Sequence, residues 1–450
     1  MYNVLRILGV LGFSVLAGCT IHPQGEANER QAASEAGKPF TRPVEHRELP
    51  SLGPQAGPDE LVRYALLSSP DLEQKYWDWR SAIEQIPQDG TQATNLALSA
   101  NIGIMRGSTG LDRSTLSAGN DPMVDIVLPP KLSTAARRAL ETARAAGLRF
   151  RKGQLDLRNK VLGAYYDYAL TAELIRLEQS DVELLKTTAM VSDARNRAGA
   201  AGLQDVLKAR NEVDLSANDI ANMQAQLIAQ QAALNALLGR PAAAALAAPM
   251  QLPQGANMEL SDEAILAAAA RENPELIAQT HDIAARQQSI ALAKLQYLPD
   301  ISISAGTDLK GIAQSILGSV TVPWLRHEAI DAAVAQAQAN LRSAESTRRQ
   351  MGNDLNAQII FDLTTLRDAS RQLELFDRTI LPRARQVVAV GRTAYETGHA
   401  TLLDLLDGQR SLISIERLVA NLRATRAKRL ADVEAITGKV VLPATQSATE

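Results

Sequence analysis

The sequence predicts a mainly helical chain with a small β part, built from two copies of one unit. Three observations predict this fold class. The 450 residues are 46% hydrophobic but only 4% aromatic, whereas compact α/β enzymes usually rely on aromatic side chains in their cores and pockets. Hydrophobic residues recur every seven positions over very long stretches, as in coiled coils. Segments about 200 residues apart also resemble each other.

The composition argues against several functional classes. Lys and Arg (47) nearly balance Asp and Glu (50) without a basic block, so the electrostatic footprint of a nucleic-acid binder is missing. A single cysteine excludes an intramolecular disulfide and a cysteine-rich metal cage. Five scattered histidines (22, 46, 281, 327 and 399) form no His-Glu-x-x-His motif, and the sequence has neither a phosphate loop nor a nucleophile elbow. We therefore expect no enzyme activity, no cofactor, no metal site and no nucleic-acid partner.

Residues 1–18 are typical of a secretory signal peptide. Arg6 supplies the positive charge, and Ile7–Ala17 form an apolar segment that is too short to cross a bilayer. The segment ends in Leu16-Ala17-Gly18-Cys19, which resembles the cleavage box of bacterial lipoproteins, so Cys19 is the predicted lipidation site. By the same resemblance, Thr20 in place of Asp favours sorting to the outer membrane. An ordinary signal peptide followed by an incidental cysteine is the alternative.

Residues 19–58 are predicted to be a lipidated N-terminal tether. The stretch holds six of the 19 prolines and shows no apolar period, which favours an extended strap over a folded element. The first repeat is placed at 59–239, a linker at 240–260, the second repeat at 261–438 and a C-terminal tail at 439–450.

The duplication is visible in short matching segments. Gly199–Leu207 matches Gly398–Leu406, and at the same offset Gly239 falls on Gly438. The chain is therefore predicted to be two copies of one unit. Each copy has an initial helix (59–86 and 261–297), two strands, a very long helix, a glycine break and a second long helix.

The second long helix of each unit carries a seven-residue hydrophobic repeat. Such a seam has a period of about 3.5 residues and specifies coiled-coil packing against neighbouring helices. The first long helix of the chain, Leu132–Ala198, would extend roughly 100 Å, which no compact globule needs. The seam positions are Val206, Ala209, Val213, Ser216, Ile220, Met223, Leu227, Gln230, Leu234 and Leu237 in the first unit, and Leu405, Gly408, Leu412, Ile415, Val419, Leu422, Arg426, Arg429, Val433 and Ile436 in the second.

Four short segments alternate apolar residues with small or polar ones. This period of two is typical of barrel strands with one lipid-facing and one lumen-facing side. Two half-buried hairpins of a soluble domain are the alternative, but the recurrence in both repeats and the leader favour a membrane barrel. An open sheet edge in lipid leaves backbone groups unpaired, so several chains must pool their strands, and three chains would supply twelve. The segments are 95–104, 124–128, 301–306 and 320–322.

Several motifs, in this order, resemble the TolC-type outer-membrane efflux family. The resemblance covers residues 59–438 and implies a homotrimer, in which a twelve-stranded β-barrel in the outer membrane of a Gram-negative bacterium continues as a twelve-helix periplasmic tunnel. It further implies a passive exit duct that contacts outer-membrane lipid and docks with an inner-membrane pump, RND-type or similar, through a periplasmic adaptor (membrane fusion) protein. The motifs are Tyr297-Leu298-Pro299-Asp300, Val322-Pro323-Trp324, Leu381-Pro382-Arg383-Ala384, and Tyr395-Glu396-Thr397-Gly398 ahead of Leu402–Asp407.

The same resemblance makes the region around Gly398 the turn where the periplasmic tunnel closes, with Tyr395, Asp404 and Asp407 on gating positions. Asp404 and Asp407 share a helix face, so three copies would gather six carboxylates into a ring that attracts cations. The alternative is that these aspartates only stabilise the first turns of a helix. Ala400 stands where family members have a basic tethering residue, so a salt-bridge lock at that position is not expected.

Two other functions stay open at this point. The chain could be a structural coiled-coil lipoprotein that spans the periplasm without conducting, or the outer-membrane component of a type I protein secretion system. The alternating strands favour a conduit over a strut, because only conduction needs a barrel. Trp77 and Trp79 are expected to serve packing rather than a binding site.

Overall fold

The computed structural model describes residues 20–53, 56–92, 96–102, 114–120, 127–249, 252, 261–308 and 314–438. The chain divides into two compact units. The first, named here the sheet unit, comprises Met1–Lys38, Lys75–Phe150 and Glu275–Met351; the second, the tip unit, comprises Pro39–Gln74, Arg151–Pro274 and Gly352–Glu450. Each unit therefore contains parts of both sequence repeats.

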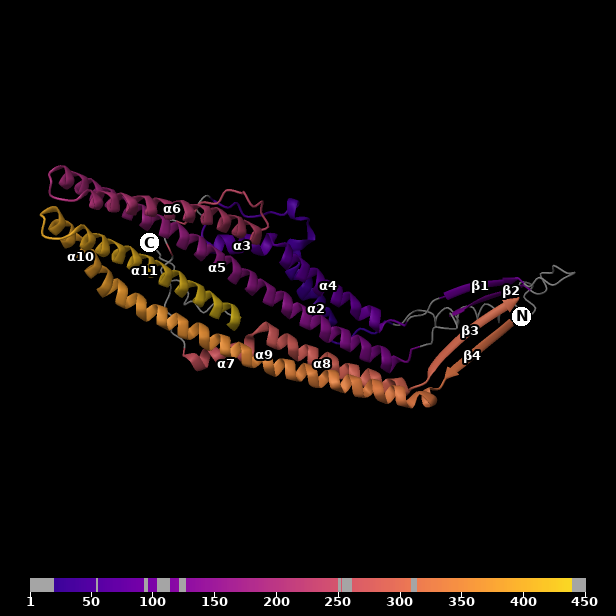
Figure 1. Cartoon of the computed structure of the whole chain (residues 1–450). Helices are drawn as coiled ribbons and strands as arrows, with labels where there is room; N and C mark the ends of the chain where they lie inside the picture. Colours follow the sequence, from indigo (N-terminus) through magenta and orange to yellow (C-terminus); the bar gives the residue numbers. More distant parts are fainter. Residues whose placement is uncertain are drawn as a thin grey trace, which may run out of the picture. The chain divides into compact units, whose positions relative to one another are not determined.

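The element order follows the predicted duplication (Figure 1). Before the first repeat lie α2 (Glu26–Ala36) and the 3-10 turns η1 (Lys38–Thr41) and η2 (Val44–His46). The first repeat contains α3 (Pro58–Ser68), α4 (Pro70–Gly90), β1 (Leu96–Ile102), β2 (Ser114–Asn120), α5 (Pro129–Arg197) and α6 (Leu203–Leu237). The second contains α7 (Asp262–Glu272), α8 (Pro274–Lys294), η4 (Leu295–Tyr297), β3 (Asp300–Asp308), β4 (Gln314–Thr321), η5 (Pro323–Arg326), α9 (His327–Leu375), η6 (Phe376–Ile380), α10 (Leu381–Glu396) and α11 (Leu402–Thr437).

Each predicted initial helix is two helices in the structure. The first breaks at Ser69 between α3 and α4, and the second breaks at Asn273 between α7 and α8. A proline follows each break, and the residue before a proline is driven out of the helical region. Ser69 and Asn273 accordingly have extended ψ angles of 122° and 117°. The prediction of one continuous helix is therefore wrong at the same place in both repeats.

The long helices agree with the prediction. α5 has 69 residues and α6 begins at Leu203. All ten predicted seam positions of α6, and all ten of α11, are buried or half-buried, while most positions between those of α6 face solvent. A π-helical turn, η6, precedes α10. Pro382 lies just after this turn and has no backbone N–H for a regular helical bond. Among the described residues, none of the helices contains an apolar stretch that could span a bilayer.

The four strands form one antiparallel sheet in the order β1-β2-β3-β4. β2 pairs with β3 from Thr115↔Asp308 to Gly119↔Ser304, so the hairpins of the two repeats join into a single sheet. β1 and β4 are its edge strands.

The second strand lies elsewhere than predicted. It was expected at 124–128, but β2 is Ser114–Asn120; residues 127–128 are not strand, and 124–126 lie outside the described residues. β2 is rich in small and polar residues, so its period-two signal is weak. Backbone pairing with β1 and β3 fixes it in the sheet instead. The other three predicted segments coincide with β1, β3 and the end of β4.

The N-terminal stretch is also more ordered than an extended strap. Residues 26–36 form α2, which packs on α4. The Trp79 indole donates to Glu29 over 2.8 Å, Arg30 pairs with Glu84 at 2.9 Å, and Ala33 is fully buried. The prolines lie on both sides of this segment rather than within it, so nothing prevents a helix between them. Trp79 is thus a packing residue as expected, whereas Trp77 is half exposed.

Candidate gate at the end of the tip unit

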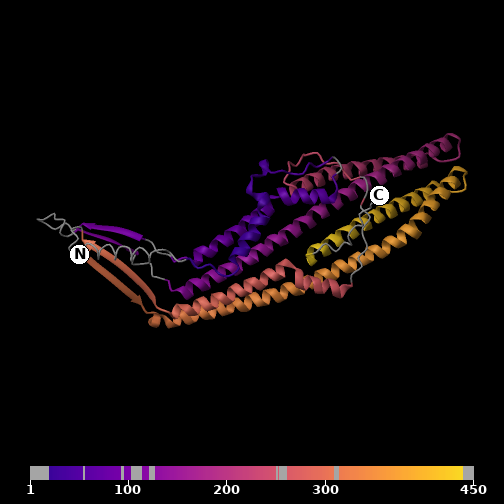
Figure 2. The same ribbon diagram turned by 180° about the vertical axis from the view of Figure 1, so that it is seen from behind.

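Two glycine turns lie at the same end of the tip unit (Figure 1, Figure 2). One joins α5 to α6 and contains Gly199 with φ 72°; the other joins α10 to α11 and contains Gly398 with φ 83°. Both φ angles lie in the left-handed region, which residues with a Cβ rarely adopt. The matched glycines therefore turn the chain at equivalent places, and they bring the predicted gate residues to one end of the unit.

Tyr395 is buried at this end, with 2% of its surface exposed. It packs in a small apolar cluster with Leu185, Ala209, Leu402, Leu405 and Leu406. Its hydroxyl donates to the Ser192 hydroxyl over 3.1 Å. The tyrosine thus links α10 of the second repeat to α5 of the first.

Arg195 makes a second link between the same two helices. Its guanidinium carbon lies 4.6 Å from the centroid of the Tyr395 ring and the side chain donates a hydrogen bond to the Tyr395 carbonyl oxygen. A cation stacked on a ring in this way is worth roughly 0.5–2 kcal/mol. Arg195 is not among the predicted gate residues, although it lies three residues from Ser192 and therefore on the same face of α5.

Asp404 takes part in capping the N-terminus of α11. Its carboxylate accepts hydrogen bonds from the Thr401 backbone N–H at 3.0 Å and from the Thr401 hydroxyl at 2.6 Å, and that hydroxyl accepts from the Asp404 N–H at 3.2 Å. This reciprocal arrangement is a capping box. The hydrogen bonds from Thr401 lower the pKa of Asp404, so the carboxylate stays charged at neutral pH while facing solvent.

Asp407 lies one turn further along α11 and is also exposed. Its Oδ1 is 3.6 Å from Nη1 of Arg410, whose other terminal nitrogen pairs with Glu212 of α6. Exposed pairs of this kind contribute little stability. The structure therefore places the two predicted carboxylates on one exposed stretch of α11, while the buried Tyr395 lies beneath.

Polar contacts continue along α5 and α11 away from the turns. Gln409 donates to the Thr188 hydroxyl over 2.9 Å, and Glu178 accepts from Ser216 at 2.7 Å and from Arg417. Further along the same pair of helices, Lys428 pairs with Asp167 at 2.5 Å, Asn159 donates to Asp432 at 2.8 Å, and Arg158 pairs with Glu434 at 2.7 Å. Hydrogen bonds and ion pairs thus join the two repeats along most of this contact.

Burial raises the pKa of one carboxyl group close to these contacts. Asp181 of α5 is half-buried next to Glu178, and desolvation together with that neighbouring charge raises its pKa to about 6. Arg417 opposes the shift, whereas Glu416 and Glu212 add to it. Asp181 therefore titrates near pH 6, and the charged residues that shift its pKa lie on α5, α6 and α11.

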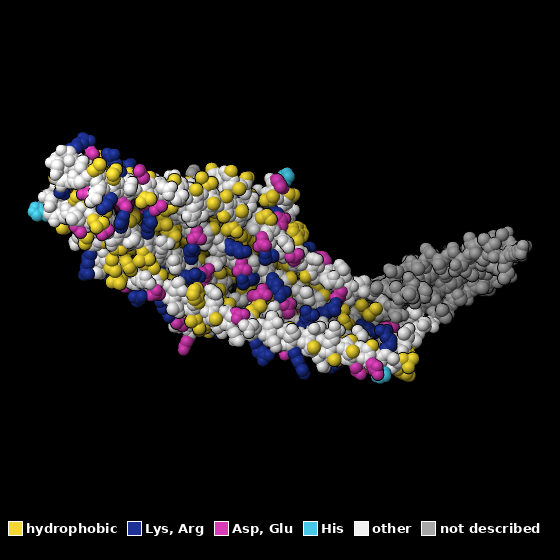
Figure 3. All heavy atoms as spheres, viewed as in Figure 1, with side chains coloured by type: hydrophobic (Ala, Val, Ile, Leu, Met, Phe, Trp, Pro, Cys, Tyr) yellow, Lys and Arg dark blue, Asp and Glu magenta, His cyan; other side chains and the backbone are white. Residues whose placement is uncertain are grey.

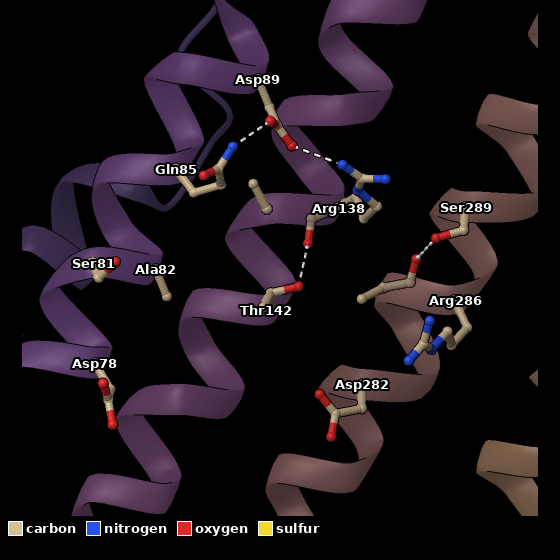
Figure 4. Close-up of a pocket in the computed structure, with 12 residues that line it drawn as sticks. Asp78, Ser81, Ala82, Gln85, Asp89, Arg138, Thr142, Asp282, Arg286 and Ser289 are labelled. Atoms are coloured by element: carbon tan, nitrogen blue, oxygen red, sulfur yellow. Dashed lines mark hydrogen bonds and ion pairs between the residues drawn. The ribbon is translucent and has the colours of Figure 1, made fainter. Parts of the chain in front are cut away.

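The sheet unit contains a polar groove of about 530 Å³ between α4, α5 and α8 (Figure 4). Arg138 pairs with Asp89 at 2.9 Å, and Gln85 donates to the same carboxylate at 2.6 Å. Asp282, which also lines the groove, pairs with Arg149. Three of the charged residues that line the groove, Asp89, Arg138 and Asp282, thus belong to ion pairs. The lining shows no arrangement of a nucleophile beside a base that would mark a catalytic site.

Metal-ligating residues are not clustered in the part of the chain that the structure describes, where no group of three His, Cys, Asp or Glu could hold an ion. Acidic and basic side chains intermingle over the helices on the face in Figure 3, unlike the single-sign surface of a nucleic-acid binder. Cys19, the predicted lipidation site, lies outside the described residues.

Comparison with known proteins identifies the family. The family model for outer membrane efflux proteins matches residues 61–240 and 265–439. This chain belongs to the outer membrane efflux protein family. The family contains channel proteins rather than known enzymes, and the predicted resemblance is confirmed.

The curated relatives are distant members of this family. The cobalt-zinc-cadmium resistance protein CzcC of Cupriavidus metallidurans is 26% identical over 62% of this chain and 66% of its own length. Nodulation protein T of Rhizobium leguminosarum is 22% identical over 64% of each chain. The matched part therefore spans slightly less than two thirds of these two relatives.

Solved structures of the family share this fold. The outer-membrane channel OprN superposes with a TM-score of 0.76 over 86% of this chain and 91% of its own, at 18% identity. CusC superposes with a TM-score of 0.73 over 85% of this chain and 92% of its own, also at 18% identity. The mostly helical architecture with few strands is thus a shared feature of efflux family members.

Proposed function

We propose that this chain is the outer-membrane exit channel of a tripartite efflux system. Three copies form a twelve-stranded barrel in the outer membrane and a twelve-helix tunnel in the periplasm, anchored through acyl chains on Cys19. Cargo passes passively from an inner-membrane pump that docks through a periplasmic adaptor. Membership in the outer membrane efflux protein family supports this role.

The sheet supports closure of several copies into one barrel. Three successive antiparallel pairings make the edge strands β1 and β4 run in opposite directions. β4 of one copy can therefore pair with β1 of the next without changing the antiparallel pattern. A barrel closed in this way has no free edge, as lipid requires, and twelve strands leave a lumen that eight do not.

Exposed apolar side chains on the long helices support the same assembly. Large hydrophobic residues face solvent on α6, α9 and α10 of a single chain, and exposed apolar surface on long helices is available for contact with other chains. Neighbouring copies in a tunnel would cover them. They are Leu207, Leu215, Ile228, Ile360, Phe361, Val387 and Val390.

We propose that the tip of the tunnel is its gate. Arg195 and Tyr395 hold α10 against α5, while Asp404 and Asp407 of three copies place six carboxylates around the axis. Such a ring favours cations over anions. Opening requires Tyr395 to leave its cluster, which gives a closed resting state.

For cargo, we propose metal cations as the first class to test. One relative is named for cobalt, zinc and cadmium resistance, and another is named the cation efflux system protein CusC of Escherichia coli, 21% identical over 72% of this chain. Growth of a deletion strain on these metals checks the proposal: increased sensitivity that the intact gene restores supports it, and unchanged sensitivity contradicts it.

Conductance tests the channel itself. The purified lipidated protein should run as a trimer after chemical cross-linking and produce discrete current steps in a planar bilayer. A cross-linked trimer without current would instead favour a periplasm-spanning strut. A stable monomer that leaves the membrane when Cys19 is replaced by Ser would contradict both the barrel and the trimer.

A further inference from the structure

Large apolar side chains lie exposed where β3 and β4 meet their helices. Trp324 and Leu325 of η5 are 78% and 99% exposed. Tyr297 ends η4 and Leu298 follows it, and both are exposed as well. The turns η4 and η5 contact each other. These four residues, Tyr297, Leu298, Trp324 and Leu325, are named here the collar.

The collar continues an apolar face of the sheet. Val320 and Val322 lie two residues apart on either side of Thr321, so they share a face of the β4 hairpin end, and both are exposed. Trp324 and Leu325 follow immediately along the chain. Exposed apolar side chains therefore follow one another along the chain from the end of the strand into the short helical turn.

Polar and basic groups border the collar. The Tyr297 hydroxyl donates to Asp331 over 2.7 Å. The Lys131 ammonium donates to the Leu298 carbonyl oxygen at 3.2 Å and pairs with Asp300 at 2.5 Å. Arg326, next to Leu325, is exposed. Apolar side chains beside a tyrosine with an anchored hydroxyl and long basic side chains make up the composition of a membrane interface.

We propose that the collar lies in the head-group and upper acyl region of the periplasmic leaflet, with phospholipid as its partner. The inference rests on the proposed function, because it requires β3 and β4 to span the membrane. Aromatic girdles mark both borders of membrane barrels, and Arg326 at this depth meets lipid phosphates, which attract it. A neighbouring copy would bind through the backbone of edge strand β4, which leaves the apolar side chains of the strand face directed at lipid.

The first repeat lacks such a collar but has another anchor. Residues 90–95 and 127–131 flank its hairpin and contain no Trp or Tyr. Thr20 instead forms a β-bridge with Thr91, supported by a 2.9 Å bond from the Ile21 N–H to the Gly90 carbonyl oxygen. The residue next to Cys19 is thus fixed just before β1. Acyl chains hold the first hairpin at the membrane, and the collar holds the second.

Tryptophan quenching by brominated phospholipids tests this inference. The full lipidated protein is reconstituted into vesicles of phosphatidylcholine brominated either near the head group or deep in the chains. The chain has three tryptophans, so wild type is compared with Trp324→Phe and with the control Trp77→Phe. We expect quenching in wild type, strongest with shallow bromines, that Trp324→Phe reduces at least severalfold and Trp77→Phe leaves unchanged.

Equal quenching of wild type and Trp324→Phe overturns the collar. So does shielding of Trp324 from both bromolipid and aqueous acrylamide, because a neighbouring copy would then cover it. Leu325→Trp, introduced at an exposed position, provides a second reporter that should add shallow quenching. Current recorded after the same vesicles are fused with a planar bilayer separates the two proposals. Current without quenching overturns the collar alone, whereas absence of current in both the wild type and Arg195→Ala, whose gate is loosened, overturns the channel.

Discussion

Gly239 packs directly against Ser68: a Cβ at position 239 would lie 2.8 Å from the Ser68 carbonyl oxygen. The second repeat has the same joint, where a Cβ at Gly438 would lie 3.0 Å from the Glu272 carbonyl oxygen. Both glycines have positive φ, 63° and 71°. The two repeats therefore share one close backbone contact. It joins the end of α6 to the end of α3 in the first repeat, and the end of α11 to the end of α7 in the second.

Gly239→Ala should destabilise the tip unit. The left-handed backbone costs a residue with a Cβ roughly 1–2 kcal/mol, and the contact with Ser68 adds to this. We expect a loss of about 2–3 kcal/mol in unfolding free energy, measured by denaturant unfolding and seen as a lower melting temperature.

Gly163→Ala is the matched control for this change. Gly163 lies within α5, and a Cβ there would meet nothing within 4 Å. Because glycine inside a helix costs roughly 0.5–1 kcal/mol relative to alanine, this variant should be neutral or slightly more stable. Similar destabilisation by both variants would show that the joint at 239 has no special role.

The sequence predicts the helices and the sheet to different extents. Heptad positions such as Val206 and Leu234 locate α6 because one face of a helix is buried along its whole length. The sequence does not predict β2, because its residues are small and polar. Its strand conformation depends instead on backbone pairing with β1 and β3. Tertiary pairing of this kind leaves no local pattern to read.

The candidate gate is likewise predictable from the sequence only in part. Matching the glycine turns correctly brings Tyr395 and Asp404 to one end of the tip unit. The contact of Arg195 with Tyr395 spans 200 residues of sequence, so only the fold reveals it. The helix α2 differs from the prediction for another reason: the proline content of the whole tether favours an extended strap, but no proline lies within residues 26–36.

Removing the Arg195 side chain should loosen the gate. Arg195→Ala loses both the ring contact and the hydrogen bond to the Tyr395 carbonyl oxygen, so we expect a higher open probability in planar bilayers. Arg195→Lys keeps the charge but not the planar stacking and should lie between wild type and Arg195→Ala. Open probabilities that are equal in all three proteins would argue against a constraint at this residue.

Tyr395→Phe should have a smaller effect. The ring and its cluster remain, but the fully buried Ser192 hydroxyl loses its hydrogen bond from the tyrosine, which costs about 1 kcal/mol. Faster hydrogen exchange of amides near residue 395, without loss of the folded trimer, is the expected observation. Unchanged exchange would mean that water replaces the tyrosine hydroxyl at no cost.

Neutralising the exposed carboxylates should change ion selectivity. We expect Asp404→Asn and Asp407→Asn each to lower cation-over-anion permeability, measured as the reversal potential in a salt gradient, and the double variant to lower it further. An asparagine at 404 still offers an oxygen to the Thr401 N–H, so the helix cap survives the change.

Thr401→Ala provides the control for the helix cap. It breaks the capping box at a cost of about 1 kcal/mol without altering charge. Its reversal potential should match that of wild type. A shift as large as that of Asp404→Asn would mean that selectivity depends on the structure of the turn and not on the carboxylate.

Asp181 should make the tip unit more stable in mild acid. Its pKa is raised to about 6 by burial and by Glu178, whereas an unfolded aspartate has a pKa of about 3.9. Between these values the folded state binds more protons than the unfolded state, so the contribution of Asp181 to stability is complete below about pH 4 and is lost as pH rises through about 6. Asp181→Asn removes this pH-dependent contribution and should raise stability at pH 7 more than at pH 5.

The measurement is the pH dependence of the denaturant midpoint. Glu183→Gln, at an exposed position on the same helix, is the control. If Asp181→Asn and Glu183→Gln change that dependence equally, burial of Asp181 contributes nothing to it.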